Sequence, residues 1–259
     1  MALRYPTLHS LIKPIYKCRD SLIGVAHMFT NRQEARGGNK RLHGVSVNMA
    51  ERIRLASASS RRMEWLTEHL PNSIEINVKP LAGEEKISEG EVSSQVVFVL
   101  EDKITRAKIQ YFLEKQNALV NNSISPPNIW IVGDTLVEDP NDVYTALGQP
   151  VDEISALRML LDISGCRHLV WSATAIIDFR LEEPRIDRFL ESSVVEFEKL
   201  DEHVLENLIS SESWRGKAGG YDLAGPAKKY SKLIKGELVT VLGFSNEAIM
   251  HLREITLQI

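Results

Sequence analysis

The feature that most constrains the fold is a short apolar segment that passes directly into a serine- and arginine-rich segment and then into a helix. Ile53–Ala56 has the length and composition of a short buried strand. Met63, Leu66 and Leu70 then recur at helical spacing, which predicts a helix beginning near Ser60–Arg61. A strand followed at once by a helix is typical of folds in which helices cover a sheet.

Strands and helices continue along the chain without strict alternation. We predict strands at Ile129–Val132, His168–Ile177, Val194–Lys199 and Glu237–Leu242, and helices at Val92–Phe112, from Pro150–Asp152 onward, at Asp201–Ile209 and at Ser245–Leu252. Asn117–Asn128, with paired asparagines and two prolines, is predicted to be a surface loop. This order predicts an α/β fold with a mixed twisted sheet flanked by helices.

Three of the predicted helices have features that define a buried face or a cap. The helix at Val92–Phe112 is predicted to bury one face, which consists of Val96, Leu100, Ile104, Ala107 and Tyr111. The helix after Asp152 is predicted to bury Ile154, Leu157 and Leu161, and Asp201 is the predicted N-cap of the next helix.

Charge is distributed unevenly along the chain. Residues 1–48 contain eight Lys or Arg and two Asp or Glu, whereas the whole chain contains 31 and 35. The remainder is therefore acidic, with 23 basic and 33 acidic residues. Because nucleic-acid binding requires a basic face, we expect no nucleic-acid partner. A small phosphate ligand needs only a few local cations and backbone amides.

Residues 1–48 differ from the rest of the chain, with scattered arginines and no sustained periodicity. Three interpretations fit this segment: a disordered basic extension, a transit peptide, or translated sequence upstream of a true start at Met49. We assign it no catalytic role and predict one folded domain over residues 49–259.

Composition also bears on the compartment. No apolar run approaches the ~20 residues that span a bilayer, so we expect a soluble protein without a membrane partner. The two cysteines, Cys18 and Cys166, have no metal-ligand spacing and cannot form a disulfide scaffold. A reducing, cytoplasmic location fits this usage.

Ser57–Arg62 is the first segment whose residues are suited to binding a ligand. It lies where a strand gives way to a helix, so unpaired amides and the positive end of the helix dipole face outward. Small hydroxyl residues let an anion approach the backbone, and Arg61 and Arg62 add donors that match phosphate oxygens. An ordinary serine-rich helix cap with exposed arginines would have the same sequence.

Two later segments add further candidates. Asp134 follows a buried strand, where a carboxylate can bind a divalent metal or activate water, although it can equally cap a turn. In the glycine-rich segment Lys217–Gly225, Lys217 could contact phosphate and Tyr221 could line a base pocket. A flexible turn with a solvated lysine is the alternative. We expect His168, within a strand, to be packed or hydrogen-bonded rather than a metal ligand.

Common nucleotide and hydrolase motifs are absent from the sequence. It contains no GxxxxGK[ST], HExxH, paired CxxC or GxSxG string. Kinase, zinc-hydrolase and serine-esterase functions therefore lack support.

In their order, these segments resemble the Maf-like nucleotide pyrophosphatases. Leu55–Arg62 (LASASSRR) matches the family's LASxSPRR string, with Ser60 in place of proline, and Asp134-Thr135 matches its Asp-Thr pair. The other matching blocks are Leu147–Pro150, Ser164–Ser172, Lys217–Gly225 and Gly236–Gly243. The resemblance runs from Ile53 to Leu252.

The resemblance implies a two-lobed fold with a nucleotide cleft, similar to the ITPases, and a homodimer. It also implies hydrolysis of a nucleoside triphosphate to the monophosphate and pyrophosphate, assisted by Mg²⁺ or Mn²⁺. Asp134 would orient or deprotonate the attacking water. Glu85, with Glu84 as the alternative, and Asp134 would bind the metal. The residues implied in substrate binding are Ser57, Arg61, Arg62, Lys103 (with Lys108 as its rival), Thr135, Gln149, Lys217 and Tyr221.

Two positions depart from the family pattern. Gln149 replaces the lysine of the family's LGKP string, and Ala224 replaces a glutamine in its glycine-rich turn. Gln149 can donate hydrogen bonds, but without charge assistance. The Asp-Thr pair and the Lys-Ala-Gly turn resemble the branch that acts on dTTP and UTP, which predicts a pyrimidine substrate. The alternative is a catalytically weakened, nucleotide-binding regulator of cell division.

Overall fold

The computed structural model describes residues 51–83, 86 and 88–257, with the side chain of residue 257 excepted. The predictions for residues 1–48, for Glu85 and for its alternative Glu84 concern residues outside this range. The described elements, in chain order, are β1 (Glu51–Leu55), α1 (Ser60–His69), β2 (Ile74–Val78), α2 (Val92–Asn121), β3 (Ile129–Asp139), β4 (Asp142–Leu147), α3 (Glu153–Ile163), β5 (Arg167–Asp178), β6 (Arg185–Phe197), α4 (Glu202–Ser210), the 3₁₀ turns η2 (Ala218–Gly220) and η3 (Pro226–Tyr230), β7 (Ser231–Lys235), α5 (Leu238–Leu242) and α6 (Asn246–Leu257).

The described strands form a seven-stranded mixed sheet. Its order is β2-β1-β3-β5-β6-β7, and β4 pairs with the far end of β3. β1 is parallel to β2 and to β3, whereas β3, β5, β6 and β7 are antiparallel in succession. The predicted mixed α/β fold is therefore confirmed.

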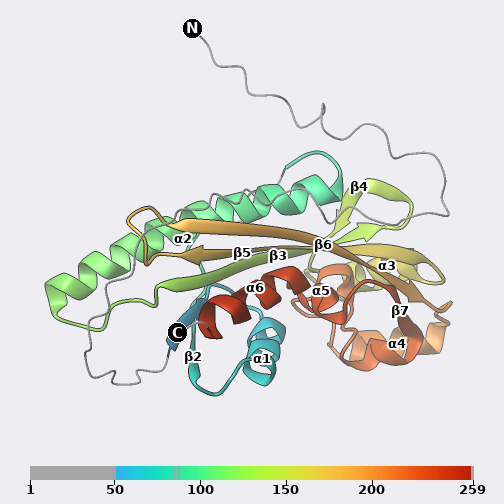
Figure 1. The fold of residues 1–259 in the computed structure, drawn as a ribbon. Coiled ribbons are helices and arrows are strands. Elements are labelled where there is room, and N and C mark those ends of the chain that lie inside the picture. Colours follow the sequence, from blue (N-terminus) through green and yellow to red (C-terminus); the bar gives the residue numbers. More distant parts are fainter. Residues whose placement is uncertain (1–50, 84–85, 87, 258–259) are drawn as a thin grey trace, which may run out of the picture. The chain divides into compact units, whose positions relative to one another are not determined.

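Helices cover both faces of the sheet. α2 runs along one face, and α1 and α6 cover the other (Figure 1). Consecutive side chains on β3 point to opposite faces, so Trp130 and Val132 pack with α2, whereas Ile129 and Ile131 pack with α1 and α6. All five residues of the predicted α2 face are buried, which confirms that face.

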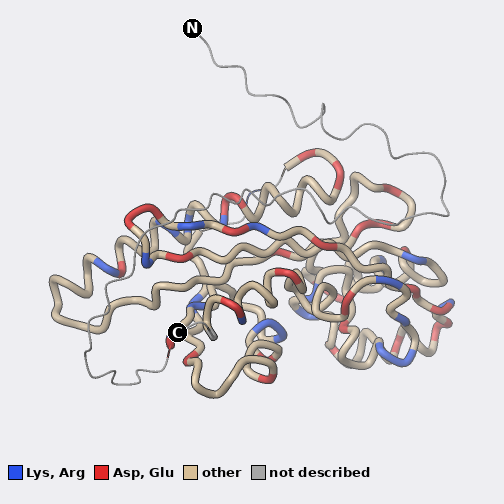
Figure 2. Tube along the Cα trace, viewed as in Figure 1, with Lys and Arg blue, Asp and Glu red and all other residues tan. Residues whose placement is uncertain are grey.

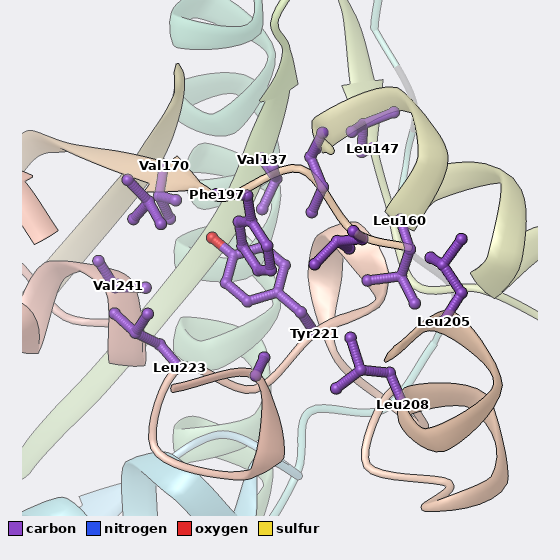
Figure 3. Close-up of a cluster of buried hydrophobic side chains, with 14 residues drawn as sticks. Val137, Leu147, Leu160, Val170, Phe197, Leu205, Leu208, Tyr221, Leu223 and Val241 are labelled. Carbon is purple, nitrogen blue, oxygen red and sulfur yellow. The ribbon is translucent and has the colours of Figure 1, made fainter. Parts of the chain in front are cut away.

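A third apolar cluster lies where β3, β5 and β6 meet α3 and α4. Phe197 and Tyr221 stand at its centre, with Val137 and Leu160 close by (Figure 3). The Asp201 carboxylate accepts a hydrogen bond from the Val204 amide, so Asp201 is the N-cap of α4 as predicted.

Charged residues of both signs are interspersed along these elements (Figure 2). Of the helices that the structure describes, none combines the length and apolar character needed to cross a membrane.

α2 is longer than predicted. It continues to Asn121, so the prediction of a loop over Asn117–Asn128 is wrong for its first five residues. The chain from Phe112 to Asn121 contains no glycine or proline to end a helix. Glu114 also ties this extension to the sheet, because its carboxylate pairs with Arg54 at 2.8 Å and Lys79 at 2.7 Å.

The predicted buried face of α3 is wrong. Ile154 and Leu161 are exposed, whereas Ala156, Leu160 and Ile163 are buried. Both sets have helical spacing, and only the packing partners distinguish them.

The predicted strand Glu237–Leu242 is also wrong, because Leu238–Leu242 forms the short helix α5. Its β-branched residues favour a strand by propensity. However, Gly236 turns the chain with a φ of +87°, and the Ser193 hydroxyl donates to the Glu237 carbonyl and accepts from its amide. The strand in this part of the chain is β7, which ends at Lys235, before the turn.

Several strands extend beyond their apolar segments. β3 continues for seven residues past Val132, and β6 begins at Arg185, although only Val194–Lys199 was predicted. β2 and β4 were not predicted from the sequence. These segments are polar on one side and partly exposed, so hydrophobicity alone does not reveal them.

Candidate active site

The candidate site forms around a gap in the sheet beside β3. β1 pairs with β3 only as far as Leu55 and Ile131, after which the Ala56 amide donates to the Ile131 carbonyl. β4 joins the same side of β3 at Val137. Among the described strands, residues 132–136 therefore have no partner on this side, and we call this stretch the open edge of β3.

Two predicted site residues lie on the open edge and point to opposite faces. Asp134 faces α2, where its Oδ1 accepts a hydrogen bond from Lys103 Nζ at 2.7 Å. Thr135 faces α1, where its Oγ accepts a hydrogen bond from Arg62. Because β1 has already ended, side chains from both faces border the same gap.

Arg62 connects its own segment, at Ser57, with two segments that are distant in sequence. Its Nε donates to the Gly243 carbonyl at 2.8 Å, its Nη1 to Ser57 Oγ at 3.2 Å and its Nη2 to Thr135 Oγ1 at 2.9 Å. Ser59 caps α1 by accepting from the Arg62 amide, so the helix begins where the sequence predicted. This network holds the Ser57 and Thr135 hydroxyls beside the guanidinium.

Arg61 and Lys217 form a second cationic group, on either side of Asp222. Arg61 Nη1 lies 3.9 Å from Asp222 Oδ1, and Lys217 Nζ lies 3.7 Å from Asp222 Oδ2. Burial lowers the pKa of Arg61, although the Asp222 charge opposes this effect. Burial and the charge of Arg61 likewise lower the pKa of Lys217. Both cations have therefore lost hydration in a place where an anion would stabilise them.

Lys103 and Asp134 form a buried ion pair, with 9% and 7% of their surfaces exposed. Lys103 also donates to the Gly133 carbonyl at 3.4 Å. Lys108 lies five residues further along α2 and is only partly buried. The placement therefore favours Lys103 over its rival as the site lysine.

Tyr221 is buried, and its hydroxyl is hydrogen-bonded within the protein. The hydroxyl and His168 Nε2 form a hydrogen bond at 2.8 Å, and burial raises the pKa of the tyrosine. Its ring lines a small cavity with Arg61 and Thr135. The cavity volume is about 10 Å³, which holds roughly one water molecule. His168 is packed and hydrogen-bonded, as predicted.

Gln149 lies in the loop beside the glycine-rich turn. The Gly219 amide donates to the Gly148 carbonyl at 3.0 Å, which joins the two segments, and the Gln149 side chain is exposed. Among the described residues, no group of three or more His, Cys, Asp or Glu side chains is placed to hold a metal ion.

Sequence reasoning missed two residues of this arrangement. Asp222 lies inside the glycine-rich turn, next to Tyr221. Only this position in the sequence could have indicated that it belongs to the site. Gly243 was noted only as the end of a matching string. Its carbonyl accepts a hydrogen bond from Arg62, which lies 181 residues earlier in the sequence, so no local pattern indicates this contact.

Comparisons with known proteins place the chain in a family of related sequences. The family model described as Maf-like protein matches residues 52–254. A dTTP/UTP pyrophosphatase of Agathobacter rectalis is 34% identical over 74% of this chain and 90% of its own length. One from Pyrococcus furiosus is 28% identical over 79% of this chain and 95% of its own length.

A longer human protein matches as well. The probable bifunctional dTTP/UTP pyrophosphatase/methyltransferase protein of Homo sapiens is 30% identical over 75% of this chain. The match spans only 30% of that protein's length. Because the family model covers well over half of the sequence, the chain belongs to the Maf-like protein family.

Proposed function

We propose that this protein hydrolyses nucleoside triphosphates, with dTTP or UTP preferred, to the nucleoside monophosphate and pyrophosphate. The observation that carries the proposal is the position of three residues around the open edge of β3, namely Arg62, Asp134 and Arg61, which lines a small cavity with Thr135. Lys217 lies near Arg61 through the carboxylate that they share. The names of the bacterial and archaeal relatives support both the reaction and the pyrimidine preference.

The cations match the charge of the substrate. A nucleoside triphosphate carries several negative charges that repel an approaching nucleophile, so cationic side chains must neutralise the phosphate oxygens. Arg61 and Lys217 are poorly hydrated cations, and phosphate oxygens would replace their lost hydration. The Ser57 hydroxyl, which accepts a hydrogen bond from Arg62, adds a neutral donor beside the open edge.

Asp134 is our candidate general base. It would orient or deprotonate a water molecule whose oxygen attacks the α-phosphorus. The bond between the α-phosphorus and the bridging oxygen then breaks, and pyrophosphate leaves with the electron pair. Lys103 holds the Asp134 carboxylate in place through the 2.7 Å contact.

A divalent cation, Mg²⁺ or Mn²⁺, is part of the proposal. Mg²⁺ is commonly held by one or two carboxylates together with substrate phosphates rather than by a complete protein cage. Asp134 offers one such carboxylate at the open edge of β3, which fits an ion that binds together with the nucleotide. Glu85 would be the second protein ligand. The ion would supply further neutralisation of phosphate charge.

The decisive experiment measures pyrophosphate release from a panel of ribo- and deoxyribonucleoside triphosphates, with Mg²⁺ or Mn²⁺ present. We expect release to be fastest with dTTP and UTP. Nucleotide binding without turnover across the whole panel would contradict the proposal and favour the regulator.

Asp134→Asn tests the assignment of the base. We expect this variant to lose about 100-fold or more in turnover, since general-base catalysis typically contributes that much. Glu196→Gln is the matched control, because it removes one carboxylate from an exposed pair with Arg167. Full activity of Asp134→Asn, with both variants folded by circular dichroism, would exclude this role.

Two further predictions from the sequence accompany this proposal. We place the reaction in the cytoplasm, as the cysteine usage indicates, and we expect a homodimer by resemblance to the family. Fractionation of the native cells and sedimentation of the purified chain would test them.

A further inference from the structure

Asp222 occupies a place in the candidate site that is suited to a phosphate. Its two carboxylate oxygens face different cations, Oδ1 toward Arg61 and Oδ2 toward Lys217. The side chains of all three residues are less than a fifth exposed. A bidentate anion therefore already lies between the two cations that the proposed function assigns to substrate phosphates.

The two cations need an anion at this position. Each pKa is lowered chiefly by burial, and the charge of Arg61 adds to the effect on Lys217. Arg61 Nε is buried and has no hydrogen-bond partner among the described residues. The contacts to Asp222, at 3.7 and 3.9 Å, are longer than charge-assisted hydrogen bonds of about 2.8 Å. The carboxylate thus compensates the charges without fully satisfying the donors.

We propose that Asp222 is an internal counter-ion that occupies the phosphate-binding position of Arg61 and Lys217 and yields it to the substrate. This inference rests on the proposed function. A triphosphate must displace the carboxylate from the two cations, so Asp222 weakens the binding of every polyanion. When pyrophosphate leaves, the carboxylate returns to the cations and speeds its release. Asp222 is therefore a positioning residue. It lowers the affinity for the substrate and raises the turnover rate by speeding the release of pyrophosphate.

A purely structural role is the competing explanation. Asp222 Oδ1 accepts a hydrogen bond from the Ala224 amide at 3.0 Å, which forms a local turn that aspartate and asparagine both favour. Asp222→Asn keeps an oxygen acceptor for that amide but removes the charge. Asp222→Ala removes both. The two variants therefore separate the electrostatic role from the turn.

The experiment measures binding of inorganic pyrophosphate to the full chain by calorimetry, without a divalent cation. We expect Asp222→Asn to bind pyrophosphate about two- to fivefold more tightly than wild type, the range given by partly exposed ion pairs. This advantage should shrink at high salt, where screening weakens the electrostatic competition. Glu196→Gln, which removes an exposed carboxylate elsewhere, should bind as wild type does.

Thermal unfolding and kinetics supply two further readouts. Without ligand, Asp222→Asn should melt below wild type, because Arg61 and Lys217 then repel each other without compensation. Its stabilisation by pyrophosphate should be larger than that of wild type. With nucleotide substrates, both KM and kcat should fall, since pyrophosphate binds more tightly and leaves more slowly.

Equal or weaker pyrophosphate binding by Asp222→Asn would overturn the counter-ion proposal. If wild type does not bind pyrophosphate, the proposal still requires that Asp222→Asn does, and absence of binding by both would overturn it. The proposed function fails by a different result, in which wild type releases no pyrophosphate from any nucleotide.

Discussion

At the scale of single residues, the site depends on how Arg62 is held. Its guanidinium meets a backbone carbonyl and two hydroxyls from separate segments, so its orientation is set by several partners at once. A lysine has no planar fork and could not make these three contacts together. The sequence identified Arg62 from its neighbours, but the carbonyl of Gly243 could not be inferred from local pattern.

Gly243→Ala tests this support. Gly243 has a φ of +117°, and an added Cβ would lie 2.7 Å from Arg62 Nε. We expect a loss of about 1–3 kcal/mol in the free energy of unfolding, the usual cost of such backbone strain, together with reduced turnover. Gly148→Ala is the matched control, because its Cβ would meet no atom within 4 Å. Equal stability of the two variants in urea would refute this account.

His168 gives the fold a specific pH dependence. Burial lowers its pKa from 6.5 to about 4, so the unfolded chain binds the proton more readily than the folded one. The neutral imidazole therefore stabilises the fold fully above pH 6.5, and this stability is lost as pH falls toward 4. The shift corresponds to roughly 3 kcal/mol.

Urea unfolding at several pH values between 7.5 and 4.5 measures this effect. Replacing both hydrogen-bonded partners, as His168→Phe with Tyr221→Phe, removes the titrating group without leaving one polar atom unpaired. We expect the double variant to lose less stability than wild type over this pH range. Parallel pH profiles for the two proteins would mean that other groups dominate.

At the scale of elements, periodicity located the helices better than it defined their faces or ends. The buried face of α2 was predictable because five apolar residues follow one stripe over four turns. α3 offers two apolar stripes with the same spacing, and the choice between them depends on strands and helices distant in sequence. The strand prediction for Glu237–Leu242 failed because the turn at Gly236 outweighs β propensity.

Two alanine substitutions in α3 test its observed orientation. Leu160 is buried in the cluster with Val170 and Tyr221, whereas its neighbour Leu161 is half exposed. We expect Leu160→Ala to lose about 2–5 kcal/mol of stability, as large-to-small core substitutions do. Leu161→Ala should cost no more than about 0.5 kcal/mol. The reverse order in chemical denaturation would support the face that the sequence predicted.

At the scale of the whole molecule, the fold class followed from the mixture of strands and helices, but the gap beside β3 did not. The gap exists because β1 ends at Leu55 while β3 continues to Asp139, and the lengths of polar strand segments are not visible in an apolar pattern. Asp134 was expected just after a strand, yet it lies within β3 and beside the end of β1. Its chemical assignment was predictable, and its surroundings were not.

The predicted start of the folded domain at Met49 can be tested with a shortened chain. The family model begins at residue 52, so a chain that starts at Met49 should retain the complete domain. We expect this shorter chain to match the full chain in melting temperature and in pyrophosphate release. A large loss of turnover in a stably folded shorter chain would assign residues 1–48 a role in the reaction.

The open edge of β3 also bears on aggregation. Unpaired strand edges attract other extended chains, which can add to a sheet through backbone hydrogen bonds. Here the unpaired stretch covers five residues between β1 and β4, about 17 Å along the strand. An incoming polypeptide would collide with a neighbouring strand at either end. Within the part of the chain that the structure describes, the interrupted sheet therefore leaves five residues of β3 without a strand partner on one side, yet this stretch offers no edge on which fibrils could grow.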